Sequence, residues 1–590
     1  MSDRIPHRTA ESDRIPWVQL LAYGLGGFIP IALFNAVGQF SGLICNVGLG
    51  MSAMLVGMAM MIPRLWDAFT DPVMGYISDN TRSRWGRRIP FILGGGILVS
   101  VTFVALWWIP RDWGMAAQFL YFTFMSILFY TAVTIFEIPH GALGIEMTDD
   151  YHERTRLYSV KSFVGNLGAM ATPWLYAMAN WRFFKGDGDE VDGMRYVSFI
   201  VAALVLVLTF LCAYYCRERK YEQAVQQKRV SFRDNMAATL RNRSFLLLMC
   251  IVFAAVMGFN LVNGFANYIT IFYLYAGDKN SASILLGVAG TVWAVSGVLA
   301  VFPLNWLSTR LNKTRTLTLA ISLMGGAQIS KIFCYDPGHP TLILIPTVML
   351  SVGMLFFFTL GSSMVADICD EDELLTGKRN EGSYYSVFWW FMKLGMATAY
   401  FVAGILLTVT QFNEKQVTLV EELAKETTPL VRAIKGNLPG SEGFGSEDGK
   451  ALRTRAMSFA DRARLLGDEL ETMASSSRSP AHYHSLAATA RSLGSEMNGL
   501  FAEEKSLQAV AEDLKSRTGD LETEVRGLAS QTPETLIWLR ILEIGIPILL
   551  CLFSLAVIPR YPLSEERVYE IKELLAARKT NESAHGTDPA

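Results

Sequence analysis

The sequence is poor in charge and lacks the residue clusters on which enzymes rely. Only 18% of the 590 residues are charged, whereas 51% are hydrophobic and the mean hydropathy is +0.29. There is no phosphate-binding glycine loop, no Cys/His cluster with metal-ligand spacing and no nucleophile elbow. These absences argue against a soluble globular protein and against an enzyme. We expect no bound cofactor and no nucleic-acid partner.

Cysteine is also scarce, and the first residues do not have the pattern of a signal peptide. The seven cysteines all lie in or beside apolar segments, so we interpret them as small core residues and not as a disulfide framework. The first sixteen residues are polar, and the apolar segment after them is too long for the hydrophobic core of a signal peptide. We therefore predict no cleavable signal sequence.

Long apolar runs dominate the chain instead. Many of them exceed the ~20 residues that cross the ~30 Å hydrocarbon core of a bilayer, so the sequence predicts an all-α integral membrane protein with twelve spans. The expected spans are residues 17–45, 51–77, 89–109, 115–142, 157–180, 195–216, 244–274, 283–306, 316–334, 341–366, 383–410 and 535–558.

Lys and Arg are unevenly distributed over the short loops. Loop 78–88 holds four of them, loop 217–243 holds eight and loop 307–315 holds three, whereas loops 46–50, 110–114, 275–282 and 335–340 hold at most one each. Cytoplasmic loops carry the excess of positive charge. We therefore expect the central loop 217–243 and both tails, 1–16 and 559–590, to be cytoplasmic.

The most unusual stretch runs from Arg64 to Arg88. Asp67 and Asp71 lie one turn apart on an apolar helix, so they project from the same face, with Arg64 just before them. A charge near the bilayer centre costs about 2.5–3.5 kcal/mol even on mild insertion scales, which favours a cation site facing the protein interior. The alternative for Asp71 is that it ends the helix near the interface, followed by Pro72.

This stretch resembles the helix II and loop 2–3 signature of the glycoside–pentoside–hexuronide:cation symporters, a family of the major facilitator superfamily. The pattern has Trp66-Asp67, Asp71-Pro72, Gly75 and Asp79, then a run of arginines that includes Arg84. A second match, Val365 to Tyr384, resembles the family's loop 10–11 signature. The resemblance covers most of residues 17–410 and 535–558. It implies two parallel six-helix bundles with substrate bound near the midplane between them.

The resemblance also implies roles for single residues. Helix IV of the family supplies an acidic sugar-binding residue and a threonine near the cation, which correspond to Glu137 and Thr134. Lys161 stands where a relative has a sugar-contacting arginine, or alternatively extends to the cytoplasmic interface. Together with these, the predicted site comprises a cation group of Asp67, Asp71, Thr70 and Thr134, a substrate group of Glu137, Lys161, Arg64, Asn35 and Asn263, and a coupling and gating group of Lys393, Asp79, Arg84, Arg154, Asp367 and Asp370.

Some of these assignments have a simpler alternative. Amides such as Asn35 and Asn263 suit hydroxyl-rich ligands because they offer both a donor and an acceptor, but they also form interhelical hydrogen bonds. The acidic and basic residues at 146–156 fit bracing of the helix ends better than ligand binding. His140, near a helix end, fits a structural role better than proton transfer.

Two positions depart from the family pattern. Ile31 stands where the first helix of a sugar-transporting relative carries an acidic sugar-binding residue, so specificity for galactosides does not carry over. A glycoside and an anionic hexuronide both remain open. Thr70 replaces an asparagine between the two cation-site carboxylates, which leaves Na⁺ open against H⁺ or Li⁺ as the coupling ion.

Residues 411–534 lie outside the resemblance. They are polar, rich in Ala, Glu, Arg, Leu and Ser, and show repeated helical spacing. The predicted topology places this insert outside the cytoplasm, between the spans 383–410 and 535–558. We expect two to four amphipathic helices, with an antiparallel hairpin capping the outer mouth and a flexible break from Gly436 to Gly449. Two alternatives stay open for it, a tolerated insertion and a partner-binding segment.

The sequence therefore predicts a cation-coupled symporter of a sugar or glycoside, acting as a monomer in the bacterial inner (plasma) membrane. Its partners would be the small-molecule substrate, a monovalent cation and the lipid bilayer. Two other classes remain. A lysolipid transporter of the same fold needs a laterally open apolar cavity, against which the amides argue. A sensor would use the insert as its input, although no signalling domain follows.

Overall fold

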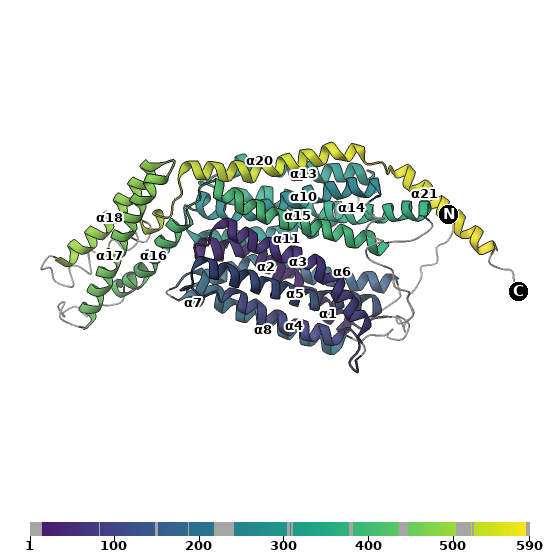
Figure 1. Cartoon of the computed structure of the whole chain (residues 1–590), viewed down its shortest axis with the longest axis horizontal. Coiled ribbons are helices and arrows are strands. Elements are labelled where there is room, and N and C mark those ends of the chain that lie inside the picture. The colour runs from purple at the N-terminus through teal and green to yellow at the C-terminus, as the bar shows by residue number, and fades with distance from the viewer. Residues whose placement is uncertain are drawn as a thin grey trace.

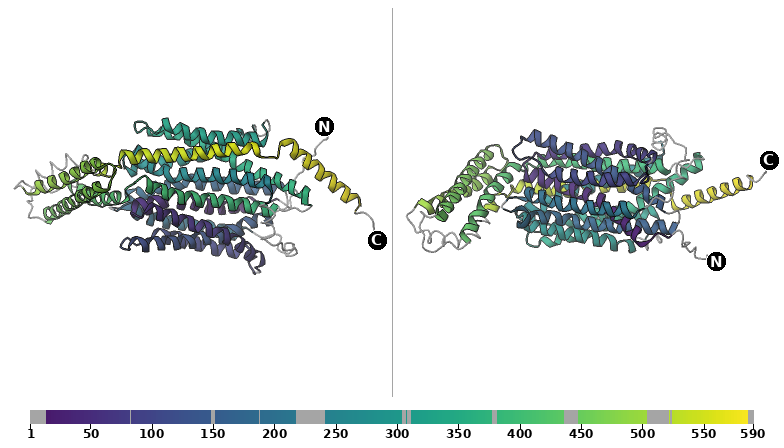
Figure 2. Two further views of the ribbon diagram at one scale, coloured as in Figure 1. Left: turned by 45° about the horizontal axis from the view of Figure 1, so that its top comes forward. Right: turned by 90° about the horizontal axis from the view of Figure 1, so that it is seen from below.

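The protein is a bundle of long helices with a smaller group of helices beyond one end. The computed structural model describes residues 14–81, 83–147, 151–186, 188–216, 241–303, 307, 311–376, 381–435, 447–502, 521 and 524–585. The long helices run along the longest axis of the molecule (Figure 1). Helices α16 (Glu414–Lys435), α17 (Glu447–Ser476) and α18 (Pro480–Ala502) gather at what we call the insert end. Helix α21 (Glu565–His585) projects from the opposite, terminal end, as two further views also show (Figure 2).

The described residues contain helices and no strands. In the bundle, the helices are α1 (Trp17–Gly26), α2 (Phe28–Ser41), η2 (Gly42–Gly48), α3 (Ala53–Asn80), α4 (Ile89–Trp107), α5 (Met115–Met147), α6 (Tyr151–Asn180), α7 (Arg182–Lys185), α8 (Glu190–Tyr215), α10 (Arg243–Tyr268), η4 (Ile269–Leu274), α11 (Lys279–Leu299), α13 (Lys313–Cys334), η5 (Pro340–Ile343), α14 (Leu344–Thr376), α15 (Glu381–Val409), α20 (Pro533–Val557) and η6 (Ile558–Arg560).

Side-chain caps fix the start of several of these helices. Asp189 accepts hydrogen bonds from the backbone N–H groups of Val191 and Asp192 at the start of α8. Asn242 and Thr532 cap α10 and α20 in the same way. Such caps satisfy backbone donors that have no partner within the helix. At α8, α10 and α20, a short polar residue therefore marks where the chain turns back into the bundle.

Ten helical segments of the described chain are long and apolar enough to cross a membrane. Helices α3 and α6 are not among them, although they are 28 and 30 residues long and pack inside the same bundle, α3 against α5 and α15, α6 against α2 and α11. Their charged residues lower the hydropathy. Ten of the twelve predicted spans thus meet the criterion, and the other two stay a prediction. The central loop 217–240 lies outside the described residues.

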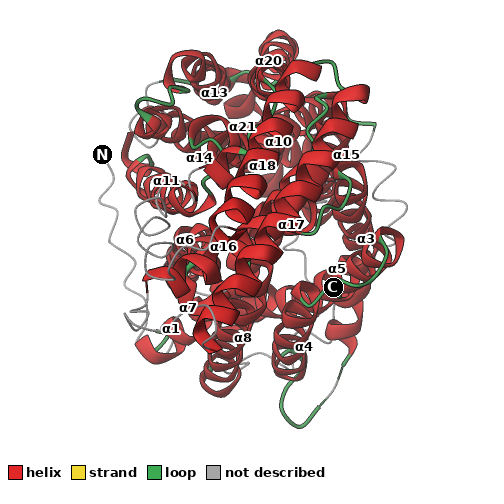
Figure 3. Ribbon diagram, turned by 90° about the vertical axis from the view of Figure 1, so that its left-hand side faces the viewer, coloured by secondary structure: helices red, strands yellow, loops and turns green. Residues whose placement is uncertain are grey.

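The insert-end helices have a hydrophobic core of their own. Its members include Leu423 of α16, Phe459 of α17 and Ala487 of α18. Helices α17 and α18 run antiparallel, because Gly467 lies against Ala487 whereas Gly494 lies against Ala460. Seen along the bundle axis, they lie across the insert end (Figure 3). The predicted flexible break falls largely on residues 436–446, outside the described part of the chain.

The two halves of the bundle meet tightly near the insert end. A Cβ atom at Gly57 of α3 would lie 2.6 Å from the backbone oxygen of Tyr400 on α15, and one at Gly404 would lie 2.6 Å from the oxygen of Ala53. On the other side, the Trp174 indole of α6 donates to the Thr291 hydroxyl of α11 at 3.0 Å. The insert end is therefore closed between the halves in this conformation.

A buried ion pair, not predicted from the sequence, joins α13 to α20. The Lys331 ammonium contacts the Glu543 carboxylate, and the Tyr335 hydroxyl donates to the same oxygen at 2.9 Å. Lys331 is 3% exposed and Glu543 is fully buried. The pair gives the Lys331 ammonium, inside an apolar helix, a partner of opposite charge.

We predict that breaking this pair destabilises the protein more than removing it entirely. Lys331→Met leaves a buried, uncompensated carboxylate, which costs about 3–5 kcal/mol of unfolding free energy. The double variant Lys331→Met/Glu543→Leu removes both charges and should regain most of that loss. The midpoint of thermal unfolding in detergent measures both. Equal midpoints for the wild type and Lys331→Met would contradict the prediction.

Candidate functional site

Helix α3 carries the charged residues of the site, and α5 and α15 complete it. The Asp67 carboxylate lies 3.8 Å from the Arg64 guanidinium on the same helix and 3.9 Å from the Lys393 ammonium on α15. Asp67 is fully buried and Arg64 is 6% exposed. The structure therefore brings together three residues that the sequence had assigned to separate groups, from two helices about 320 residues apart.

Asp71 has closer partners than Asp67. The Lys393 ammonium forms an ion pair with one of its carboxylate oxygens. The Thr134 hydroxyl of α5 donates to the other oxygen at 3.0 Å. Asp71 is only partly buried, whereas Asp67 is fully buried. Of the predicted cation group, Asp67, Asp71 and Thr134 thus lie together.

Asp67 is the under-satisfied member of the pair. Both of its carboxylate oxygens are buried, and neither has a hydrogen-bond partner among the residues that the structure describes. Its two ion pairs, at 3.8 and 3.9 Å, are too long for hydrogen bonds. A buried carboxylate without donors is costly to keep charged. An added cation in contact with these oxygens would lower that cost.

The Arg64 guanidinium is held by aromatic rings. Its central carbon lies 4.6 Å from the centre of the Phe34 ring and 4.3 Å from the centre of the Tyr130 ring. Cation–π contacts of this kind stabilise a desolvated charge by roughly 2 kcal/mol. They fix Arg64 beside Asp67. Sequence reasoning missed the two rings, since spacing along one helix does not reveal which residues of α2 and α5 face it.

The Thr70 hydroxyl does not face the carboxylates. It lies 3.4 Å from the backbone oxygen of Asp67 and 3.5 Å from that of Trp66, within its own helix. The Trp66 indole donates to the Thr131 hydroxyl of α5 at 3.0 Å, which pins α3 against α5. In this conformation, the oxygen atoms available to a cation therefore come from Asp67, Asp71 and Thr134.

Glu137 and Lys161, the main predicted substrate residues, remain available to a ligand. Both are partly buried, and neither makes a hydrogen bond or ion pair within the described chain. The Lys161 ammonium lies 5.9 Å from the centre of the Tyr23 ring. Glu137 lies within electrostatic reach of both Lys161 and Lys393. An acid and a base without partners, inside the bundle, can orient a polar ligand.

The predicted amides are divided between two environments. Asn35 donates to the backbone oxygen of Ile31 at 2.9 Å, so its amide is engaged within α2. Asn263 lines a cavity of about 60 Å³ between α2, α3, α10 and α15. Tyr400 and Gln39 line the same cavity. In this closed conformation the cavity is too small for a sugar.

Apart from Lys393, the predicted coupling and gating residues whose side chains the structure describes have contacts of their own. Asp367 of α14 forms an ion pair with Lys313 at the start of α13, 2.5 Å between nitrogen and oxygen. Arg84 is exposed and lies over the Trp85 ring. Asp370 is partly buried on α14 and has further contacts. The side chains of Asp79 and Arg154 fall outside the described part of the structure.

His140 packs as a structural residue would. Its ring stacks on Tyr23, with 4.4 Å between the ring centres, and its Nε2 atom lies 3.0 Å from the Tyr23 backbone oxygen. A Cβ atom at Gly26 would come within 2.4 Å of that imidazole nitrogen. The imidazole thus fills the space that the glycine leaves between α1 and α5.

Comparisons with known proteins agree with this architecture. A family model described as MFS/sugar transport protein matches residues 22–426. The isoprimeverose transporter of Lactiplantibacillus pentosus is 26% identical, over 68% of this chain and 82% of that protein. The glucuronide carrier protein homolog of Escherichia coli K12 is 25% identical, over 70% and 87%. The sodium-dependent lysophosphatidylcholine symporter 1 of Gallus gallus is 22% identical, over 73% and 86%.

A solved structure supports the fold. The crystal structure of a D-xylose–proton symporter superimposes with a TM-score of 0.51 at 14% identity, covering 66% of this chain and 90% of that one. Fold and matches define a multi-pass membrane transporter, not an enzyme. The chain belongs to the MFS/sugar transport protein family, in which the glycoside–pentoside–hexuronide:cation symporters fall.

We predict that the Lys393 ammonium stabilises the Asp67 and Asp71 carboxylates when no cation is bound between them. Lys393→Gln leaves Asp71 with only the Thr134 hydroxyl, and an unpaired, partly buried charge costs about 1–3 kcal/mol. The cation-free variant should therefore unfold at a lower temperature than the wild type, and added Na⁺ or acid should restore more stability to it. Thermal unfolding at several Na⁺ concentrations and two pH values measures this. Lys393→Arg, which keeps the charge, is the control; a Lys393→Gln variant as stable as Lys393→Arg would rule the prediction out.

Proposed function

We propose that this protein is a cation-coupled secondary active symporter of a sugar or glycoside, a hexuronide included. The observation that carries the proposal is the fully buried Asp67 carboxylate, which has no hydrogen bond among the described residues. The names of the two sugar-related relatives, an isoprimeverose transporter and a glucuronide carrier homolog, favour a small polar substrate. The chain would cross a bacterial inner membrane twelve times, with α3 and α6 as the two charged spans and both tails in the cytoplasm.

The cation would bind between the carboxylates of Asp67 and Asp71. Carboxylate and hydroxyl oxygens are ligands that hard cations prefer, and Thr134 supplies a hydroxyl beside Asp71. No cluster of three or more His, Cys, Asp or Glu side chains suited to a metal occurs among the described residues, which favours a monovalent ion such as Na⁺. A proton taken up by Asp67 is the alternative.

Lys393 links the cation to the substrate in this proposal. A cation that enters between the carboxylates competes with the Lys393 ammonium for the same oxygens. The displaced ammonium lies within reach of Glu137, so it would change the charge next to the substrate group. Cotransport needs each ligand to favour the other's binding, typically by 1–3 kcal/mol. The two halves would then rock around the occupied sites.

Glu137, Lys161 and Asn263 would bind the substrate. Lys161 offers a charge to a carboxylate, which suits a hexuronide, and Glu137 accepts hydrogen bonds from hydroxyl groups. The lysophosphatidylcholine symporter among the relatives keeps lipid transport as a second candidate. Glu137, Lys161 and Asn263 argue against lipid transport, because these partly buried polar groups would lose water without gaining hydrogen-bond partners when an acyl chain binds.

Neutralising either carboxylate of α3 should separate transport from its driving force. We expect Asp67→Asn and Asp71→Asn to lower cation-driven accumulation at least ~10-fold, which corresponds to about 1.4 kcal/mol of lost coupling, while exchange of substrate across the membrane continues. Uptake into cells or proteoliposomes with and without a cation gradient measures both. The control is Asp336→Asn, at a partly exposed turn. Normal accumulation in both α3 variants would show that the cation site lies elsewhere.

Glu137→Gln tests the substrate group separately. The amide keeps the size of the side chain but loses the charge, so hydrogen bonds to it weaken by about 1 kcal/mol or more. We expect substrate affinity to fall ~5-fold or more while cation affinity changes little. Ligand-induced shifts of the unfolding midpoint, recorded for each ligand alone, measure the two affinities. A larger loss for the cation than for the substrate would assign Glu137 to the cation site.

A further inference from the structure

The segment at the insert end contacts both halves of the bundle. Helix α16 follows α15 directly, after a tight turn in which Gln411 has a φ of 57°. The Asn413 backbone N–H donates to the Gln531 side chain at 2.9 Å, and the Gln416 amide donates to the backbone oxygens of Leu528 and Ser530. These bonds tie the start of α16 to the chain that leads into α20. The start of α16 is therefore attached to the C-terminal half through α15 and the chain before α20.

Side chains of α16 nevertheless bind the N-terminal half. The Glu414 carboxylate accepts hydrogen bonds from the Asn46 amide at 3.0 Å and from the Ala53 backbone N–H at 3.2 Å, where η2 leads into α3. About three turns further along α16, the Lys425 ammonium lies 2.9 Å from the Asp189 carboxylate at the start of α8. Two attachment points on one rigid helix thus span the junction between the halves.

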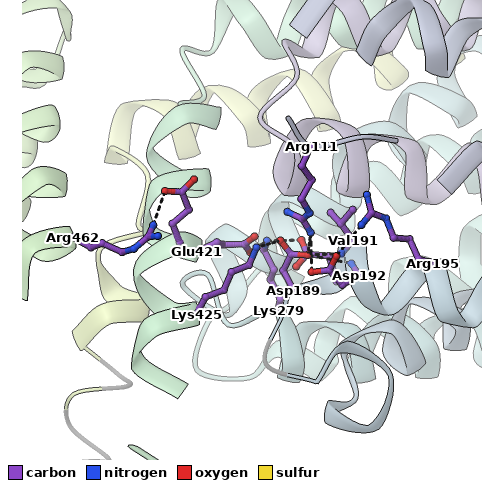
Figure 4. Close-up of polar contacts among 11 residues, drawn as sticks. Arg111, Asp189, Val191, Asp192, Arg195, Lys279, Glu421, Lys425 and Arg462 are labelled. Atoms are coloured by element: carbon purple, nitrogen blue, oxygen red, sulfur yellow. Dashed lines mark hydrogen bonds and ion pairs between the residues drawn. The ribbon is translucent and has the colours of Figure 1, made fainter. Parts of the chain in front are cut away.

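A network of charges surrounds the second attachment point (Figure 4). Asp189 also forms an ion pair with Arg111. Lys279, at the start of α11, lies 2.6 Å from the Glu190 carboxylate and contacts Glu421 of α16 as well. The network therefore joins α16, the N-terminal half and the C-terminal half through one set of alternating charges.

The carboxylates and Lys279 of this network are largely removed from water, whereas the side chains of Lys425 and Arg111 are 31% and 32% exposed. The side chains of Asp189 and Glu190 are 6% and 2% exposed, and those of Lys279 and Glu421 are 11% and 16% exposed. Burial opposes ionisation of Asp189, but Arg111 and Lys425 outweigh it and hold the pKa of that carboxyl well below its usual range. The carboxylate thus stays charged at neutral pH, and charges at this depth attract more strongly than at the surface.

This contact is polar and leaves space beside it. A cavity of about 450 Å³ lies between α16, the α6–α8 turn and the start of α11, and Lys185, Asn280 and Arg526 are among its lining residues. Interfaces that separate and re-form are more polar than permanent ones. The surface between α16 and the N-terminal half therefore has the character of a contact that can open.

We propose that α16 is a latch: Glu414 and Lys425 hold the insert end closed by binding the N-terminal half, and they must release it before that end can open. The inference rests on the proposed alternating access. Asn46 and Ala53 lie beside Gly57, where α3 meets α15. Separating the halves there would pull both attachment points apart. The latch gives the insert a function, which is to favour the conformation closed at its end.

Accessibility of the cavity beneath the latch tests the proposal without any substrate. Ala403, which lines the 60 Å³ cavity, is replaced by Cys in a parent variant, and the rate at which a membrane-impermeant thiol reagent labels the new thiol is measured. The protein that keeps Ala403 gives the background labelling. Glu414→Gln/Lys425→Gln, which leaves the net charge unchanged, should label at least tenfold faster than the parent. Arg462→Gln breaks an exposed ion pair within the insert and should label like the parent. Equal rates in parent and double variant would overturn the latch.

A cross-link provides the complementary test should the double variant fold poorly. The variant Asn46→Cys/Glu414→Cys carries one thiol on each side of this contact, and a short, reducible bifunctional thiol reagent joins them, because Cys is shorter than the Asn and Glu side chains whose polar atoms now meet at 3.0 Å. Cross-linking should lower transport at least tenfold, and reduction should restore it, whereas each single variant should keep its transport in the presence of the reagent. Full transport by the cross-linked protein would overturn the latch. The labelling test needs neither sugar nor cation, so it does not depend on the proposed cation site. If the latch variant labels faster as expected while the Asp67 and Asp71 variants accumulate substrate normally, the cation site is rejected and the latch is not.

Discussion

The architecture depends on one electrostatic contact, that of the buried Asp67 carboxylate with Arg64 and Lys393. It joins α3 of the first half to α15 of the second, through distances of 3.8 and 3.9 Å that are too long for hydrogen bonds. A fully buried carboxylate without donors is stable only as long as both cations stay near it. The contact therefore holds the halves together and at the same time leaves a group that an added cation would satisfy better.

Other features of the bundle keep that contact in place. Phe34 and Tyr130 enclose the Arg64 guanidinium, and the close approach of Gly57 and Gly404 aligns α3 with α15 near the insert end. Helix α16 then bonds across the same junction through Glu414 and Lys425. The proposed cation site and the proposed latch thus both act on the pair of helices α3 and α15, so a change in the packing of this pair at one place would alter the other.

The sequence predicted an all-α membrane transporter and its family, because apolar length and the motif from Arg64 to Arg88 are local signals. It also placed Asp67, Asp71, Thr134 and Lys393 in related roles, and the structure brings these four together. It could not orient Thr70, whose hydroxyl turns to its own backbone.

Contacts between distant segments could not be predicted from the sequence, because local signals do not determine how helices pack against one another. The partner of Lys331 is Glu543, 212 residues away, and nothing in either helix alone specifies how it is rotated about its axis. The attachment of Glu414 to Asn46, across 368 residues, is a further case. Both pairs lie outside any local motif, and only the packing of the whole bundle brings them together.

The most direct test of the central claim is ligand-induced thermal stabilisation of the purified protein. Glycosides, hexuronides and lysolipids are each added with and without Na⁺, at two pH values. A ligand that binds only the folded state stabilises it in proportion to the logarithm of its concentration over Kd. The account predicts a shift with a glycoside or hexuronide that grows when Na⁺ or acid is present, and that Asp67→Asn abolishes this growth. A shift with lysolipids alone, or a sugar shift indifferent to Na⁺ and pH, would contradict it.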